Sequence, residues 1–254
     1  HGGEYSYTNG TPPESGIDFE PDNIATINKR CKIENVLLRN NATYGIMITE
    51  NEDVEVRGCS FLSNGISAVY ITKQSNVMVN NCVSRKNKFL YFDNQPSAVK
   101  NVVISQNEIY LSAQNDLFIC VGNTPYYTGI VKFLSNHIEY VDTTGKSIEL
   151  NASLDDEDIM LVKNNTIVIP VGFLATSLLG GNGLVYVNYK PQNVQVSENV
   201  FINKSSTSLS LLNSNGMGFY GRPNTYIGSI SDYMGKVNGD YKSVTIGGGT
   251  VISA

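Results

Sequence analysis

The sequence contains no tryptophan, only two histidines and few charged residues, which make up 16% of the chain. The formal net charge is −5, so the chain lacks the clustered basic surface of a nucleic-acid-binding protein, and we expect no nucleic-acid partner. It also lacks an apolar run long enough for a transmembrane helix, so we expect no membrane insertion. What remains is a chain of 254 residues, which is long enough to bury a substantial core.

Cysteine is also scarce, and its spacing argues against a metal site. The four cysteines, Cys31, Cys59, Cys82 and Cys120, include no close CxxC pair of the kind that binds zinc. The acidic run DDED at residues 155–158 could bind Ca²⁺ through carboxylate oxygens, or could be a solvated acidic turn. We therefore predict no metal site and no cofactor, with Ca²⁺ at this run as the alternative.

The chain opens with HGGEYSYTNG, which contains neither an initiator methionine nor a secretion signal. We expect it to be a segment of a longer protein, whose targeting information would lie in the part that is not seen.

The most informative feature that is present is a repeat. Each copy reads as an apolar residue, two others, a small or polar residue, one other and then usually an apolar residue. The fourth positions are Val36, Cys59, Cys82, Asn107, Asn136, Asn165 and Asn199. Their spacings, taken as differences between these numbers, are 23, 23, 25, 29, 29 and 34. A period in the twenties that drifts upward by insertion is typical of a solenoid in which each repeat forms one coil.

A second strand-like block follows each copy and alternates apolar with polar residues. The blocks are YGIMITEN, SAVYITKQ, KFLYFDNQ, DLFICVGN, KSIELNAS, GLVYVNYK and SLSLLNSN, and SGIDFEPD before the first copy fits the same slot. Parallel strands of successive coils would pair roughly 4.8 Å apart and bury every second side chain, which this alternation allows.

The fourth position of the repeat predicts a ladder inside the coil. Asn107, Asn136, Asn165 and Asn199 would stack with each side-chain amide bonded to the next. Val36, Cys59 and Cys82 would continue the same column. We expect the last two to be free thiols, although neighbouring coils would bring them close enough for a disulfide.

This pattern resembles the right-handed parallel β-helix of the pectate-lyase-like superfamily. Segments such as SGIDFEPDN and VEVRGCSFLSNGISAVYIT look most like β-helix proteins of bacteria and of bacteriophage tailspikes and appendages. The resemblance implies an all-β fold, a right-handed parallel β-helix of about eight coils over residues 1–213. Residues 214–254 would form a glycine-rich cap, or an assembly segment that docks other subunits in a homotrimer.

The stretch SGIDFEPDN also predicts an acid–base pair. With Ile17 and Phe19 facing inward, Asp18 and Glu20 would face outward, roughly 6.5–7 Å apart along the strand. That separation suits two carboxylates that cleave a glycosidic bond, one as acid and one as base. Exposed acids that only improve solubility are the alternative reading.

The outward columns that begin at these two acids predict a sugar-binding face. Asp18 would continue as Met47, Tyr70 and Tyr91, and Glu20 as Thr49, Thr72 and Asp93. Aromatic faces beside carboxylates and hydroxyls suit a glycan chain. We therefore predict substrate contacts by Tyr70, Tyr91, Asp93, Thr49 and Thr72.

Other catalytic arrangements are not evident in the sequence. There is no Ser-His-Asp pattern, His1 lies at the start of the chain, and His137 follows a ladder position where we expect it to be solvated.

The combined prediction is a carbohydrate-active β-helix. It would bind and cleave a bacterial surface polysaccharide or a teichoic-acid-like polymer, as a glycoside hydrolase or a polysaccharide lyase. The alternatives are a glycan-binding or adhesive stalk without activity, and a structural shaft of a phage tail or cell-surface protein. The β-helix fold hosts all of these functions. The resemblance to tailspikes implies a receptor-binding role at an extracellular or virion surface.

Overall fold

In the computed structural model, the regular elements among the described residues are all β-strands, and none is a helix. The structure describes residues 15–19, 29–49, 51–72, 76–86, 88–92, 101–111, 119–121, 130–141, 148–150, 159–172, 185–187, 193–205, 209–210, 212–214, 225–227, 230–232, 236–237 and 251–252. The strands are short and pair in parallel, as the solenoid prediction requires.

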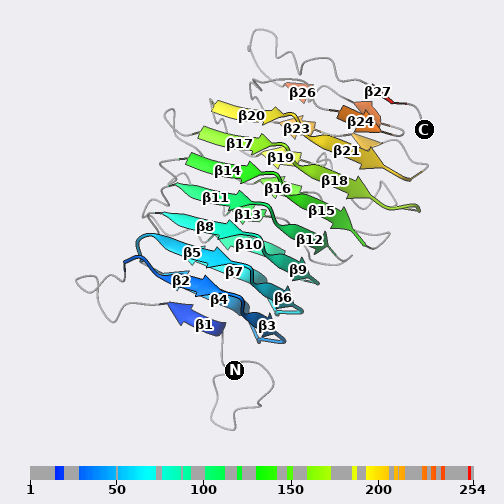
Figure 1. Cartoon of the computed structure of the whole chain (residues 1–254). Helices are drawn as coiled ribbons and strands as arrows, with labels where there is room; N and C mark the ends of the chain where they lie inside the picture. Colours follow the sequence, from blue (N-terminus) through cyan, green and yellow to red (C-terminus); the bar gives the residue numbers. More distant parts are fainter. Residues whose placement is uncertain are drawn as a thin grey trace.

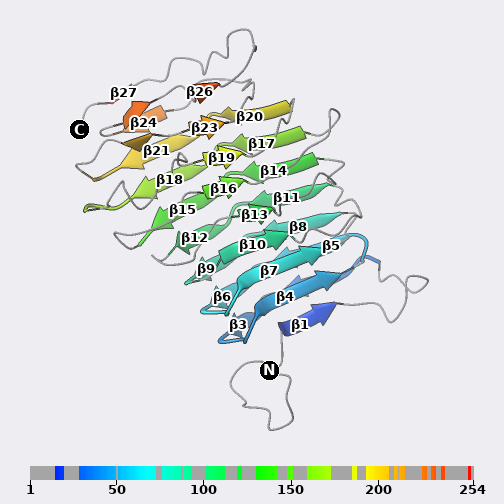
Figure 2. The same cartoon turned by 180° about the vertical axis from the view of Figure 1, so that it is seen from behind.

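Three long parallel sheets form the wall of the molecule (Figures 1 and 2). Sheet I contains β1 (Ser15–Phe19), β4 (Tyr44–Thr49), β7 (Ser67–Thr72), β10 (Lys88–Phe92) and β13 (Ile119–Val121). Sheet II contains β2 (Lys32–Glu34), β5 (Val54–Arg57), β8 (Val77–Asn80), β11 (Val102–Ser105), β14 (Ile130–Leu134), β17 (Ile159–Lys163) and β20 (Asn193–Ser197). Sheet III contains β3 (Leu37–Arg39), β6 (Ser60–Leu62), β9 (Val83–Arg85), β12 (Glu108–Leu111), β15 (His137–Tyr140), β18 (Thr166–Ile169), β21 (Val200–Asn203), β24 (Thr225–Ile227) and β27 (Val251–Ile252).

Two smaller groups of strands complete the described part. A four-stranded sheet holds β16 (Ile148–Leu150), β19 (Val185–Val187), β23 (Leu212–Ser214) and β26 (Lys236–Val237). A two-stranded pair holds β22 (Leu209–Ser210) and β25 (Ile230–Asp232).

The chain visits the three long sheets in turn, which makes the fold a parallel β-helix. It passes from β2 in sheet II to β3 in sheet III and β4 in sheet I, and then begins the next coil at β5. The stack runs from β1 at one end to β27 at the other (Figure 1). The predicted all-β class and parallel stacking are confirmed. The count of about eight coils, the boundary at residue 213 and the C-terminal cap stay predictions, although sheet III continues past that boundary through β24 and β27.

Alternation along each strand builds the core. In sheet II one inward column is formed by Ile33, Val56, Val79, Ile104 and Phe133, which are paired in register and at most 5% exposed. Each coil thus places one apolar side chain directly over another. Because burying an apolar side chain contributes about 1.5–3 kcal/mol, this column is a main source of stability.

The predicted asparagine ladder is confirmed. The Nδ2 atoms of Asn107, Asn136 and Asn165 each donate to the Oδ1 atom of the next ladder residue at 2.9 Å. The backbone N–H groups of the same three residues donate to those oxygens too. The residue before each ladder asparagine has a left-handed backbone, with φ values of 57°, 57°, 58° and 58° at Gln106, Ser135, Asn164 and Glu198. The ladder therefore links the sharp turns between sheets II and III in successive coils, at a point where strand pairing is interrupted.

Two cysteines continue the ladder toward the first coils, as predicted. Cys59 and Cys82 are free thiols that are each 1% exposed. The backbone N–H of Cys82 donates to Oδ1 of Asn107 at 2.9 Å, which joins the thiol and amide parts of the column. The hydrogen bond with Cys59, together with burial, raises the pKa of the Cys82 thiol.

Candidate functional site

The outer face of sheet I carries the columns in which the acid pair was predicted. Asp18 pairs in register with Met47, Met47 with Tyr70, and Tyr70 with Tyr91, as the repeat alignment predicted. Asp18 is exposed. Glu20 and Asp93 lie outside the described residues, so the geometry of the acid pair stays a prediction.

Two of the predicted sugar contacts on this face are covered in the structure. Tyr70 is only 7% exposed, and its ring stacks on that of Tyr44 with centroids 4.4 Å apart and planes inclined by 23°. Thr49 is also 7% exposed, and it pairs with Thr72 in register. The side chains of Thr72 and Tyr91 lie outside the described part. The substrate-binding roles of these residues stay predictions, but Tyr70 does not present an open ring face.

The outer face of sheet II holds a groove of about 500 Å³. It lies over β5, β8 and β11 and is lined by Asp53, Val54, Glu55, Asn76, Val77, Met78, Asn101 and Val103. Met78 and Val103 pair in register and point outward, between inward-facing neighbours that are buried. Met78 is 39% exposed, so an apolar surface is open at the floor of this groove.

One edge of the groove is a polar ladder. Asp53, Asn76 and Asn101 come immediately before β5, β8 and β11, so the stacking of the coils places them in one column. Nδ2 of Asn76 donates to Oδ1 of Asp53 at 2.7 Å, and Nδ2 of Asn101 donates to Oδ1 of Asn76 at 3.1 Å. Unlike the ladder inside the coil, these three side chains are exposed.

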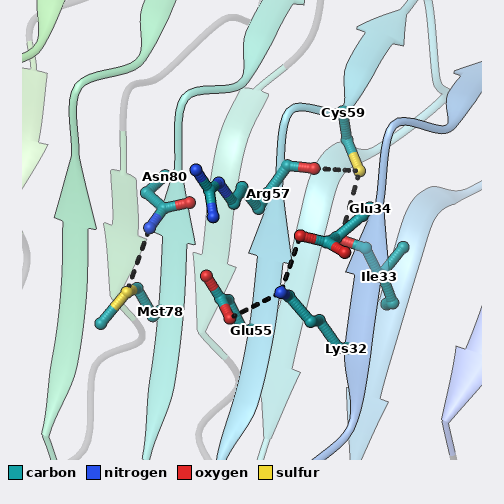
Figure 3. A network of polar contacts seen from close by, with 8 residues as sticks. All are labelled: Lys32, Ile33, Glu34, Glu55, Arg57, Cys59, Met78 and Asn80. Atoms are coloured by element: carbon teal, nitrogen blue, oxygen red, sulfur yellow. Dashed lines mark hydrogen bonds and ion pairs between the residues drawn. The ribbon is translucent and has the colours of Figure 1, made fainter.

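A charged network adjoins the groove on the first coils (Figure 3). Nζ of Lys32 lies 2.8 Å from the carboxylate of Glu34 and 3.8 Å from that of Glu55. The hydrogen bond to Glu34 is the main cause that raises the pKa of Lys32. On the far side of Glu55, Asn80 donates through Nδ2 to the sulfur of Met78 at 3.1 Å, which orients the side chain on the groove floor.

Sheet III carries a second cluster of ionisable residues. The guanidinium carbon of Arg85 lies 4.3 Å from the ring centroid of Tyr110, and the Tyr110 hydroxyl donates to Oε2 of Glu108 at 3.3 Å. The side chain of His137 is 39% exposed, in agreement with its expected outward position. Its ring lies 6.3 Å from that of Tyr110, and its Nε2 lies 3.5 Å from Oε2 of Glu139. Loss of water contact and the nearby negative charge of Glu108 raise the pKa of Tyr110. Arg85 and Glu108 are exposed and Tyr110 and His137 are half-buried, so this cluster is a polar ladder on the outer face of sheet III, in which a guanidinium and an imidazole lie beside the Tyr110 ring.

In the described ranges, no group of three or more His, Cys, Asp or Glu side chains is arranged to hold a metal ion. The acidic run at residues 155–158 lies outside those ranges, so the prediction about Ca²⁺ is open. Nor do the described residues include a helix long and apolar enough to cross a membrane.

Residues 15–226 match the family described as "Right handed beta helix region". The match covers most of the chain, which therefore belongs to this family of right-handed parallel β-helix proteins.

Comparison with solved structures finds a tailspike protein double mutant of E. coli bacteriophage HK620, solved in complex with a pentasaccharide. The TM-score is 0.46 and the sequence identity 12%, and the match covers 86% of this chain and 45% of that chain. The chain thus spans less than half the length of that tailspike protein. No curated protein sequence matches the chain.

Sequence reasoning placed the site on sheet I and missed the groove on sheet II. A signal for it was present, because Asp53, Asn76 and Asn101 are spaced by 23 and 25 residues, the period of the first coils. Met78 and Val103 gave no signal of their own, since outward apolar residues are common in strands.

Proposed function

We propose that the chain binds an extended polysaccharide in the groove on the outer face of sheet II. The observation that carries this proposal is the combination of an open apolar floor, at Met78 and Val103, with a polar ladder along one edge. Sugar rings have apolar faces and polar rims, so a glycan can cover such a floor while its hydroxyls bond to the edge.

The repeat of the fold favours a chain-like ligand over a compact one. The groove crosses three successive strands of sheet II, and parallel strands are spaced roughly 4.8 Å apart. Each of these three coils offers an outward strand residue and, immediately before the strand, an amide or a carboxylate. A polymer with repeating units can use these equivalent positions in succession.

A glycan array followed by calorimetric titration tests the proposal. Met78→Ala removes part of the floor and should weaken binding of an array ligand about three- to tenfold, since most of a methionine's apolar contact is worth about 1 kcal/mol. Leu62→Ala is the matched control, because Leu62 on sheet III is 36% exposed, close to the 39% of Met78. Equal effects of both variants, or an array on which no glycan is retained, would refute the proposal.

Cleavage of a polysaccharide at the outer face of sheet I, a different face from that of the groove, is the second candidate function. It is favoured by the outward, exposed position of Asp18 on β1, with Glu20 two residues further along the chain. Asp18→Asn and Glu20→Gln should then each abolish the release of new chain ends from a bound polysaccharide while leaving its affinity unchanged. New ends that are unsaturated would indicate a lyase, and saturated reducing ends a hydrolase.

Binding or cleavage of a polysaccharide is a function of proteins at an extracellular or virion surface, and we propose this location for the chain. Assembly into a homotrimer is part of the same proposal.

A further inference from the structure

We infer that the groove on sheet II selects an uncharged, N-acetylated glycan and rejects polyanionic polymers such as uronate chains and teichoic acids. This inference rests on the proposed function, because it names the class of glycan that the same groove would bind. Three features of the groove support this selectivity: the charge of its lining, the hydrogen-bonding capacity of its edge and the apolar chemistry of its floor.

The charge of the lining opposes polyanions. Asp53 and Glu55 are the ionisable residues among the described residues that line the groove, and both carry negative charge. Two cations belong to the adjoining network, and neither is part of the lining. Lys32 contacts the carboxylates of Glu34 and Glu55, and Arg57 lies at the end of β5, two residues beyond Glu55. Lys132 follows Val103 in the same outward column but is not part of the lining. Like charges brought together at a binding surface lower affinity and are a common source of specificity.

The polar edge matches an acetamido group. A side-chain amide has two N–H donors and an oxygen with two lone pairs, and the ladder bonds use one donor each from Asn76 and Asn101. The exposed amides can therefore offer a further N–H to an acetamido carbonyl. The carboxylate of Asp53 and the amide oxygens can accept from an acetamido N–H. A polyol can also bond to these groups, but it carries no methyl group beside them that could contact the apolar floor.

The apolar floor of the groove matches the methyl group of an acetamido substituent. An acetamido substituent ends in a methyl group, and the outward side chains of Met78 and Val103 form an apolar surface next to the amide ladder. A methionine side chain is flexible and polarizable, so it adapts to a small apolar group. One substituent can thus place its amide on the edge and its methyl on the floor, which a plain hydroxyl cannot do.

Matched oligosaccharides test the inference. The probes are a β-1,4-linked N-acetylglucosamine hexamer, its deacetylated counterpart and cellohexaose, which share one backbone, together with polygalacturonate and wall teichoic acid. By titration calorimetry the acetylated hexamer should bind at least about tenfold more tightly than cellohexaose, and the two polyanions should not bind. Tighter binding of the deacetylated, cationic hexamer would show recognition of charge by Asp53 and Glu55 and would overturn the inference.

Two variants test the apolar floor and the charge of the lining separately. Val103→Thr keeps the shape of the side chain but makes the floor polar, and should reduce the preference for the acetylated hexamer over cellohexaose. Asp53→Asn suits the left-handed backbone at this position, where φ is 55°, and should weaken the exclusion of polygalacturonate.

If only polyanions or plain glycans bind, and Met78→Ala weakens their binding, the inferred selectivity is wrong while the groove remains the binding site. If no glycan binds in a manner sensitive to Met78→Ala, the proposed function itself is wrong.

Discussion

At the scale of the residue, the same side chain serves two purposes in this protein, depending on where the coil places it. Inside the coil, asparagine is almost completely buried, with 1% exposure at Asn107, Asn136 and Asn165, and nearly all of its polar capacity is used by its neighbours. On the outer edge of the groove, Asn76 and Asn101 form the same type of ladder in contact with solvent. Burial therefore turns an amide ladder into a structural element, and exposure leaves it available to a ligand.

Replacing a buried ladder residue should destabilise the fold strongly. Asn136→Ala would leave the side-chain and backbone N–H groups of Asn107 and the carbonyl of Ile104 without their bonds to this side chain. Oδ1 of Asn165 would lose one of its two donors and keep the backbone N–H of residue 136. Unpaired buried polar groups are costly, so we expect the free energy of unfolding to fall by about 2–4 kcal/mol in a denaturant titration.

The control for this substitution is Asn76→Ala, which breaks the exposed ladder. Water can replace the bonds lost there, so the expected change is within about 0.5 kcal/mol. A similar loss of stability in both variants would contradict the distinction between the two ladders.

At the scale of the element, neighbouring strands of sheet I approach each other closely at Gly45. A Cβ atom added at Gly45, in β4, would lie 2.6 Å from the carbonyl oxygen of Ala68 and 2.7 Å from Cδ1 of Phe61. The oxygen belongs to the backbone of β7 and cannot move without disturbing the pairing. We expect Gly45→Ala to lower the free energy of unfolding by about 1–3 kcal/mol, measured by denaturant titration.

Gly58 provides the comparison for this element. Its φ of +61° is tolerated by asparagine, and a Cβ there would approach only Oδ1 of Asn35, the end of a side chain. Gly58→Asn should therefore cost less than Gly45→Ala. The reverse order would show that backbone conformation, rather than space between the strands, limits substitution.

Sequence predicted those features of the elements that repeat from coil to coil. The spacing of the fourth positions predicted the ladder, and the alternation in β1, β4, β7 and β10 predicted their register from Asp18 to Tyr91. The burial of Tyr70 was not predictable in this way, because it depends on Tyr44, which occupies a different position in the preceding repeat. The groove was missed for a related reason: it is formed by residues from three coils, and no single repeat contains it.

At the scale of the whole molecule, stacking makes each coil depend on its immediate neighbours. Strands of the long sheets pair only with the strand before and the strand after them in the stack, as β15 does with β12 and β18. The stability of such a solenoid is approximately a sum of local and nearest-neighbour contributions. A substitution that destabilises one coil should therefore lower the stability of the adjacent coils too, and this effect should decrease with distance along the axis.

Hydrogen exchange measured by mass spectrometry tests this view of the whole molecule. Asn136→Ala should lower amide protection most in β12, β15 and β18, whose turns contain or adjoin the substituted amide, because local opening exposes the groups that have lost partners. Protection in β4 and β7, which lie several coils away, should change little, whereas Gly45→Ala should give the opposite distribution. A uniform loss of protection in both variants would show that the coils unfold as one cooperative unit, and the nearest-neighbour description would then be wrong.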